Sequence, residues 1–139
     1  MNMKIETDKL LFICHRDDTG NRAYLKDRFK DKNWATVASG LDYEPYLTLM
    51  KRHKFVLCPS GNGIGSARNW ETLYMRRVPV FEDHPHKREL FREFPVLYVK
   101  SYDEVTERLL LDNDKLFEQA QRMDMKKLDL DYWFTKALK

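Results

Sequence analysis

FVLCPSGNGIGSARNWETLYMRRVPVFED, residues Phe55–Asp83, is the stretch around which the rest of the chain is organised. It begins with the apolar run Phe55–Cys58, which is too short for a helix and rich in strand formers. The loop 59–65 follows and holds three of the five glycines in the chain. Ser66 is a good helix N-cap, and the apolar residues after it recur at helical spacing. A second apolar run, Val78–Phe81, completes a predicted strand–loop–helix–strand unit.

The predicted loop lies at the carboxyl end of a parallel strand, which is where open α/β sheets bind ligands. Glycines allow the backbone to approach an anion, and the first N–H groups of a helix point toward it. Arg68 and Glu71 follow one turn into the helix. A guanidinium can donate two hydrogen bonds to a diphosphate, and a carboxylate can accept two from ribose hydroxyls.

Two common phosphate-binding loops are excluded by the residues themselves. Ser66 stands where a dinucleotide-binding loop has its third glycine, and no Lys-Ser or Lys-Thr pair closes the loop as in a P-loop. A plain tight turn therefore remains an alternative explanation of the glycines. Arg68 has an alternative of its own, as a solvated helix charge that pairs with Glu71 or Glu82.

Three segments resemble the donor-binding half of exostosin-like glycosyltransferases, which have the two-lobed GT-B fold. These segments are Lys54–Gly61 (KFVLCPSG), Arg68–Glu71 (RNWE) and Arg77–Val80 (RVPV). The resemblance extends over roughly residues 10–134, which is nearly the whole chain. The chain departs from the family in having Arg76-Arg77 in place of a small Gly-Cys pair, and it has no counterpart of the amino-terminal acceptor domain.

The resemblance implies a nucleotide-activated sugar as ligand and displacement of its nucleoside diphosphate by an acceptor hydroxyl. Arg68, the helix start and Arg16 would stabilise the charge on the leaving diphosphate, and Glu71 would hold the ribose. His15 and Arg16 follow an apolar strand at the same edge, so we expect a phosphate contact there as well. The residues expected to shape the phosphate and sugar pocket are Ser60, Gly61, Asn62, Gly63, Gly65 and Ser66. No metal cofactor is expected in this fold, and the general base usually comes from the other lobe.

Two classes of function follow from this interpretation. The first is a glycosyltransferase donor domain whose missing acceptor lobe is supplied by a partner chain or whose exposed surface is covered by a second copy of itself. The second is a non-catalytic module that binds a nucleotide or nucleotide-sugar and acts as a sensor, sequestering protein or regulatory subunit. The glycine loop does not distinguish between them.

Composition is that of a globular domain: 139 residues, 42% hydrophobic and 34% charged, with a net charge of +3. Basic residues alternate with acidic ones, which argues against a nucleic-acid-binding surface. The two cysteines, Cys14 and Cys58, each end a predicted strand and are expected to remain unpaired. We recognise no signal peptide or transmembrane run, and we expect a cytoplasmic location.

Strands and helices alternate along the chain, which predicts an α/β fold with a mainly parallel sheet of about five strands flanked by helices on both faces. We expect one Rossmann-like donor-binding domain over residues 1–139, with 1–8 as a loose lead-in. Residues 128–139 are expected to form a helix that packs back or forms an interface. The strands are expected at 9–14, 34–37, 55–58, 78–81 and 95–99, and the other helices at 21–30, 42–52, 83–94 and 114–125. One more helix is expected after Ser66, and another after the capping box that Ser101 and Glu104 form.

Three further side chains receive structural interpretations. Trp70 is expected in the core. His53 precedes a strand and is expected to be solvated or to cap a helix. His84 and His86 lie near acidic residues, but their spacing does not fit a zinc site.

Overall fold

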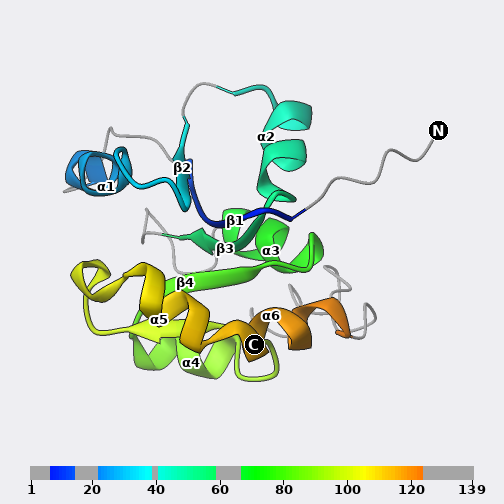
Figure 1. Ribbon diagram of the computed structural model, residues 1–139. Coiled ribbons are helices and arrows are strands. Elements are labelled where there is room, and N and C mark those ends of the chain that lie inside the picture. The colour runs from blue at the N-terminus through cyan, green and yellow to red at the C-terminus, as the bar shows by residue number, and fades with distance from the viewer. Residues whose placement is uncertain (1–6, 15–21, 39–40, 59–66, 124–139) are drawn as a thin grey trace.

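The computed structural model describes residues 7–14, 22–38, 41–58 and 67–123, with only the backbone described for 22–24, 67 and 68. Five strands form one parallel sheet in the order β2-β1-β3-β4-β5 (Figure 1). The strands are β1 (Lys9–Ile13), β2 (Ala35–Val37), β3 (His53–Leu57), β4 (Val78–Glu82) and β5 (Leu97–Val99). The predicted α/β class and parallel sheet are confirmed.

Helices cover both faces of this sheet (Figure 1). They are α1 (Arg22–Phe29), α2 (Tyr43–Met50), α3 (Ala67–Tyr74), α4 (Pro85–Leu90), a 3₁₀ turn η1 (Tyr102–Glu104), α5 (Glu107–Asp112) and α6 (Asp114–Gln121). Buried residues of α1, α5 and α6 pack against one face. Buried residues of α2 and α3 and the partly buried Leu90 of α4 pack against the other. The domain therefore has three layers, α/β/α.

The strand sequences explain why both faces are covered. Successive side chains of a strand point to opposite faces, so a continuous apolar run needs a core on each side. In β1, Leu11 and Ile13 belong to the core beneath α1 and α5, whereas Phe12 belongs to the core beneath α2 and α3. All three side chains are fully buried.

The strand order reverses between β1 and β3, which pair in parallel with Phe12 opposite Val56. Such a reversal is the point at which open α/β sheets bind ligands, at the carboxyl ends of the strands. Cys14 follows β1 and Cys58 follows β3 at this edge, and both are free thiols, as predicted. The predicted binding edge is thus the carboxyl edge at β1 and β3.

Two basic side chains connect helix α6 to the opposite, amino edge of the sheet. Lys54 Nζ lies 2.6 Å from Asp114 Oδ1. The guanidinium of Arg77 lies 5.4 Å from the centre of the Phe117 ring. Arg77 is buried and also donates to the Lys51 carbonyl, and burial lowers its pKa to about 10. The two basic residues therefore join α6 to the central strands.

Several expected boundaries differ from those observed. The helix expected over 83–94 ends at Leu90. The helix expected after Ser101 begins as the 3₁₀ turn η1, and α5 starts only after Thr106, whose hydroxyl accepts from the Leu109 N–H and caps it. The end of the expected loose lead-in is held in place, because the Thr7 hydroxyl donates to the Lys51 carbonyl and Asp8 pairs with Arg52. The helix expected over 128–139 lies outside the described residues.

The expectation of a solvated His53 was wrong, because β3 begins two residues earlier than predicted and takes His53 into the core. The alternative, that His53 caps a helix, is confirmed, because its ring bonds a carbonyl in the last turn of α2. Its Nδ1 donates to the Leu49 carbonyl at 2.8 Å, so Nε2 accepts from the Thr36 hydroxyl at 2.7 Å. The ring stacks on Phe12 with 5.1 Å between centres. Burial lowers the pKa of His53 to about 4, so the imidazole is neutral in the folded protein at neutral pH.

Helix α3 ends in a left-handed residue that is not glycine. Arg76 has φ of 60°. The Arg76 N–H donates to the Leu73 carbonyl and the Arg77 N–H to the Thr72 carbonyl, the two bonds of a Schellman cap. The Arg76 side chain donates to the Gln121 carbonyl, which joins the cap to α6. Arg76 thus occupies a position where a left-handed backbone favours glycine.

We predict that His53 makes the folded protein less stable as the pH falls from about 6.5 to about 4. The unfolded histidine takes up a proton near pH 6.5, whereas the folded one does so only near pH 4. The stabilisation is therefore complete above pH 6.5 and is lost as the pH falls through this window, by roughly 3 kcal/mol at most. Urea unfolding of the wild type and His53→Gln at pH 7, 5.5 and 4.5 measures the difference. If the free energy of unfolding changed with pH in the same way in both proteins, His53 would not be the group responsible.

We predict that Arg76→Gly is more stable than Arg76→Ala by about 1 kcal/mol. Both substitutions remove the hydrogen bond to Gln121, so the comparison isolates the cost of a Cβ atom at positive φ. Thermal and urea unfolding of the two variants provide the measurement. Equal stabilities would show that the backbone at this cap relaxes without cost.

Candidate functional site at the carboxyl edge of the sheet

The structure describes only part of the predicted site. The side chain of Arg68 and all of the following predicted residues lie outside the described part: His15, Arg16, Ser60, Gly61, Asn62, Gly63, Gly65 and Ser66. Glu71 is described, as are the ends of β3 and β4 and the whole of α3 from Ala67. The framework of the site can therefore be built from the strand ends, from Glu71 and from the residues that contact them.

Tyr102 fixes the carboxyl ends of β3 and β4. Its hydroxyl donates to the Cys58 carbonyl at 2.9 Å and accepts from the Glu82 N–H at 3.3 Å. The Cys58 N–H continues the ladder by donating to the Val80 carbonyl at 3.1 Å. Because Tyr102 is fully buried, these bonds form away from water, where an unpaired polar group is costly. The point at which the chain leaves β3 is thus rigidly held.

A buried lysine lies beneath the same strand ends. Lys87 of α4 is only 2% exposed, and its Nζ lies 4.5 Å from the centre of the Phe81 ring. Burial lowers the pKa of Lys87, while electrostatic interactions with Cys58 and Glu82 act in the opposite direction. The sequence analysis missed both Lys87 and Tyr102, since their significance depends on contacts with distant strands.

Glu71 points toward α2, where two tyrosines meet it. The Tyr46 hydroxyl donates to Glu71 Oε1 at 3.4 Å. The negative charge of Glu71, together with hydrogen bonding to it, raises the pKa of Tyr43. No described lysine or arginine side chain forms an ion pair with Glu71. Arg76, which lies five residues further along the chain, donates to the Gln121 carbonyl instead. The described hydrogen-bond partners of this half-buried carboxylate are thus tyrosine hydroxyls.

The inner face of α3 is structural. Trp70 packs against Phe91 with 4.7 Å between ring centres and against Phe94 at 6.0 Å, so its predicted place in the core is confirmed. The Thr72 hydroxyl lies 3.7 Å from Cys58 Sγ. These contacts set the rotation of α3 on the sheet, and Glu71 falls on the side of the helix that faces α2.

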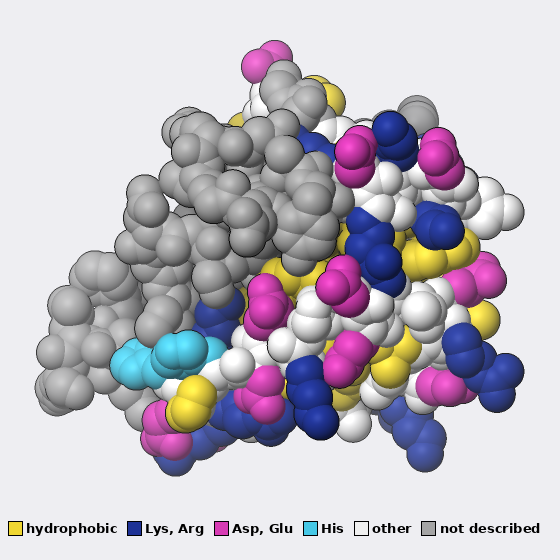
Figure 2. Space-filling view, turned by 90° about the vertical axis from the view of Figure 1, so that its left-hand side faces the viewer, with side chains coloured by type: hydrophobic (Ala, Val, Ile, Leu, Met, Phe, Trp, Pro, Cys, Tyr) yellow, Lys and Arg dark blue, Asp and Glu magenta, His cyan; other side chains and the backbone are white. Residues whose placement is uncertain are grey.

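The two exposed histidines have a structural role. His84 Nδ1 accepts from the His86 N–H at 3.1 Å and thereby caps α4. Arg88 holds Asp83 with two hydrogen bonds and lowers the pKa of that carboxyl. In the described part of the chain no three potential ligands come together around a metal position. Figure 2 shows charges of both signs interspersed over the face that carries histidine.

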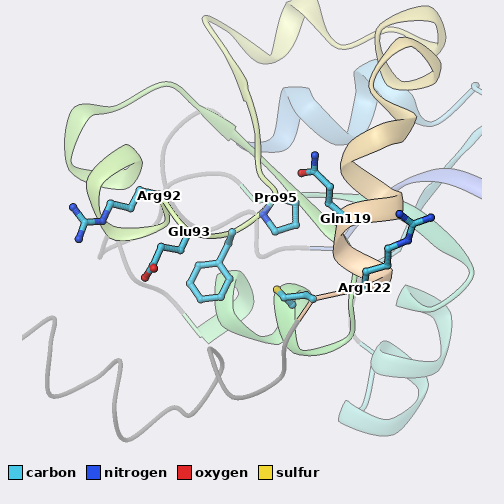
Figure 3. A pocket seen from close by; sticks show the side chains of 7 residues that line it. Arg92, Glu93, Pro95, Gln119 and Arg122 are labelled. Carbon is cyan, nitrogen blue, oxygen red and sulfur yellow. The ribbon is translucent and has the colours of Figure 1, made fainter.

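A groove of about 460 Å³ lies at the opposite end of β5 from this edge. It is lined by the segment preceding β5 and by the end of α6, namely Arg92, Glu93, Phe94, Pro95, Gln119, Arg122 and Met123. Figure 3 shows the side chains of Arg92 and Arg122 extending away from each other on either side of Pro95. Because these guanidinium groups do not converge, the groove is a poor match for a diphosphate. We therefore keep the carboxyl edge as the candidate site.

No helix in the described ranges is long and apolar enough to cross a membrane. A comparison with models of known protein families found no match, and a comparison with curated proteins also found none.

We predict that Glu71→Gln lowers the pKa of Tyr43, because the substitution removes the negative charge that disfavours the phenolate. A pH titration of ¹³C-labelled tyrosine followed by NMR measures this pKa, with assignment by Tyr43→Phe. Glu89→Gln is the matched control, since Glu89 is an exposed carboxylate on α4 that pairs with Arg92. An unchanged Tyr43 pKa in Glu71→Gln would contradict the described contact.

Proposed function

We propose that this chain binds a nucleoside diphosphate sugar at the carboxyl edge of β3 and supports transfer of the glycosyl group to an acceptor hydroxyl, with the acceptor lobe supplied by a partner. The observation that carries the proposal is the position of Glu71. It lies one turn into the helix that follows the strand-order reversal, and no described cation neutralises it. Glu71 is thus placed to accept hydroxyl donors close to a helix start.

In this proposal the start of α3 binds the phosphate groups of the ligand. An eight-residue helix presents free N–H groups and a partial positive charge at its first turn. Lys87 adds positive charge beneath the neighbouring strand ends. In the proposal, Arg68 forms two charge-assisted hydrogen bonds to the diphosphate, and Arg16 contributes from the segment after β1.

These groups also account for the chemistry. When the acceptor oxygen attacks the anomeric carbon, the bond to the diphosphate breaks and its electron pair stays on the leaving phosphate oxygen. Fixed donors and cations at that position stabilise the transition state because negative charge grows there. The acceptor's proton passes to a base in the other lobe. The protein's own cations perform the task that a divalent metal performs elsewhere, so the proposal includes no metal.

A non-catalytic nucleotide or nucleotide-sugar binding module is the second candidate. It is supported by the observation that all strands in the described ranges belong to one sheet. Transfer requires the donor, the acceptor and a base to be held together, and the described residues form only one lobe. An assay for transfer of radiolabelled sugar, with and without co-purifying chains, separates the two candidates, since only the enzyme gains activity from a partner.

We predict that the 139-residue chain binds a nucleoside diphosphate, free or sugar-linked, in the presence of EDTA. Replacing Arg68→Ala should weaken binding by roughly 2–3 kcal/mol, because the diphosphate loses charge-assisted hydrogen bonds. The melting temperature should change little, as is usual for a surface arginine. Isothermal titration calorimetry with the common diphosphates and their sugars provides the measurement.

Arg92→Ala is the matched control for this experiment, because Arg92 is an exposed arginine at the groove beyond the other end of β5. Absence of binding at millimolar ligand would refute the donor-site proposal. Equal affinities of the wild type and Arg68→Ala would instead identify Arg68 as a solvated helix charge.

A further inference from the structure

Aromatic rings form a continuous row from the core to the surface beside Glu71. The row begins at His53, which stacks on Phe12, and continues to Tyr46, whose ring centre lies 6.0 Å from that of Phe12. Tyr43 follows, with 6.3 Å and an angle of 37° between its ring and that of Tyr46. The outermost ring is thus supported by rings that are themselves anchored in the core.

The outer end of this row is open to solvent. Tyr43 is 62% exposed and Tyr74 is 57% exposed, and they are two of the four large apolar side chains that are exposed in the described part of the chain. Leu41, two residues before Tyr43, is a third. Single exposed apolar residues are common on protein surfaces. Here, however, Tyr43 of α2 lies beside the Glu71 carboxylate, which has no described cation partner, and Tyr74 of α3 interacts electrostatically with Tyr43.

We infer that Tyr43 is the stacking platform for the base of a nucleotide whose ribose hydroxyls are bound by Glu71. This inference rests on the proposed function and deepens it by assigning the nucleoside end of the ligand. A carboxylate accepts hydrogen bonds from sugar hydroxyls but repels phosphate, so the carboxylate–tyrosine cluster suits the uncharged nucleoside. A planar base stacks on an aromatic face whichever base it is.

The spacing along α3 gives the ligand a direction. Glu71 is four residues beyond Ala67, the first residue of α3, which corresponds to about 6 Å along the helix axis. Phosphates at the helix start therefore leave the ribose beside Glu71 and the base beside the first turn of α2. On binding, a ribose hydroxyl replaces the Tyr43 hydroxyl as hydrogen-bond donor to Glu71, and the Tyr43 ring turns its face to the base.

The test compares uridine diphosphate, guanosine diphosphate and inorganic pyrophosphate as ligands of the full chain by calorimetry. We expect Tyr43→Ala to lower the affinity for both nucleotides by about tenfold or more, because a stacked base loses about this much when its aromatic partner is removed. Pyrophosphate, which has no base, should bind the variant and the wild type equally. Tyr43→Phe should retain most of the nucleotide affinity because the ring remains.

Leu111→Ala is the control, because Leu111 is similarly exposed, at 52%, on the opposite layer of the domain. If the wild type binds nucleotides and Tyr43→Ala binds them with the same affinity, this inference is overturned and the proposed function still stands. No nucleotide binding by the wild type would overturn both. An affinity loss for a diphosphate sugar but not for the free diphosphate would show that Tyr43 stacks on the sugar, and would also overturn the inference.

Discussion

The parallel pairing of β1 with β3 is the constraint on which the other features of this domain depend. It places these two strands side by side, and the helices that follow them, α1 and α3, cover opposite faces of the sheet. As a result, α3 begins beside the point where the strand order reverses. The hydrogen bonds of Tyr102 then hold the ends of β3 and β4 in register. The candidate site is therefore a consequence of the topology, before any individual side chain is considered.

Charge distribution gives the two ends of the site different chemical characters. The strand ends carry the buried ammonium of Lys87, and the helix start carries N–H groups. One turn away, Glu71 and the α2 tyrosines form a cluster of hydrogen-bonding oxygens and aromatic rings. A ligand with an anionic end and an uncharged, hydroxyl-bearing aromatic end matches both. A nucleoside diphosphate has these properties.

Much of the fold was predictable because its signals are local. Apolar runs such as Leu10–Ile13 and Val78–Phe81 predict strands on their own, and the alternation with helices predicts a parallel sheet. The burial of His53 was not predicted because it depends on Thr36 and Phe12, which are brought to it only by the pairing of three strands. The pair Ser101 and Glu104 was expected to open a helix, yet Ser101 caps the 3₁₀ turn η1 and Thr106 opens α5.

The candidate site was predictable to a lesser degree. Glu71 was identified from a motif, but its contacts with Tyr43 and Tyr46 join residues 25 or more positions apart, which no local pattern encodes. Lys87 lies in the charged segment His86–Glu89, where nothing distinguishes the buried lysine from its exposed neighbours. The roles of side chains whose partners are distant in the sequence can therefore be identified only from the structure.

Backbone amide shift mapping by NMR with uridine diphosphate tests the central claim most directly, since it locates the ligand without assuming any residue's role. The account predicts that the largest shifts among the described residues fall at Cys58, at the first turns of α3 and at the start of α2. Shifts concentrated instead around the groove formed by Arg92–Pro95 and Gln119–Met123 would contradict it, because they would place the ligand at the opposite end of the sheet.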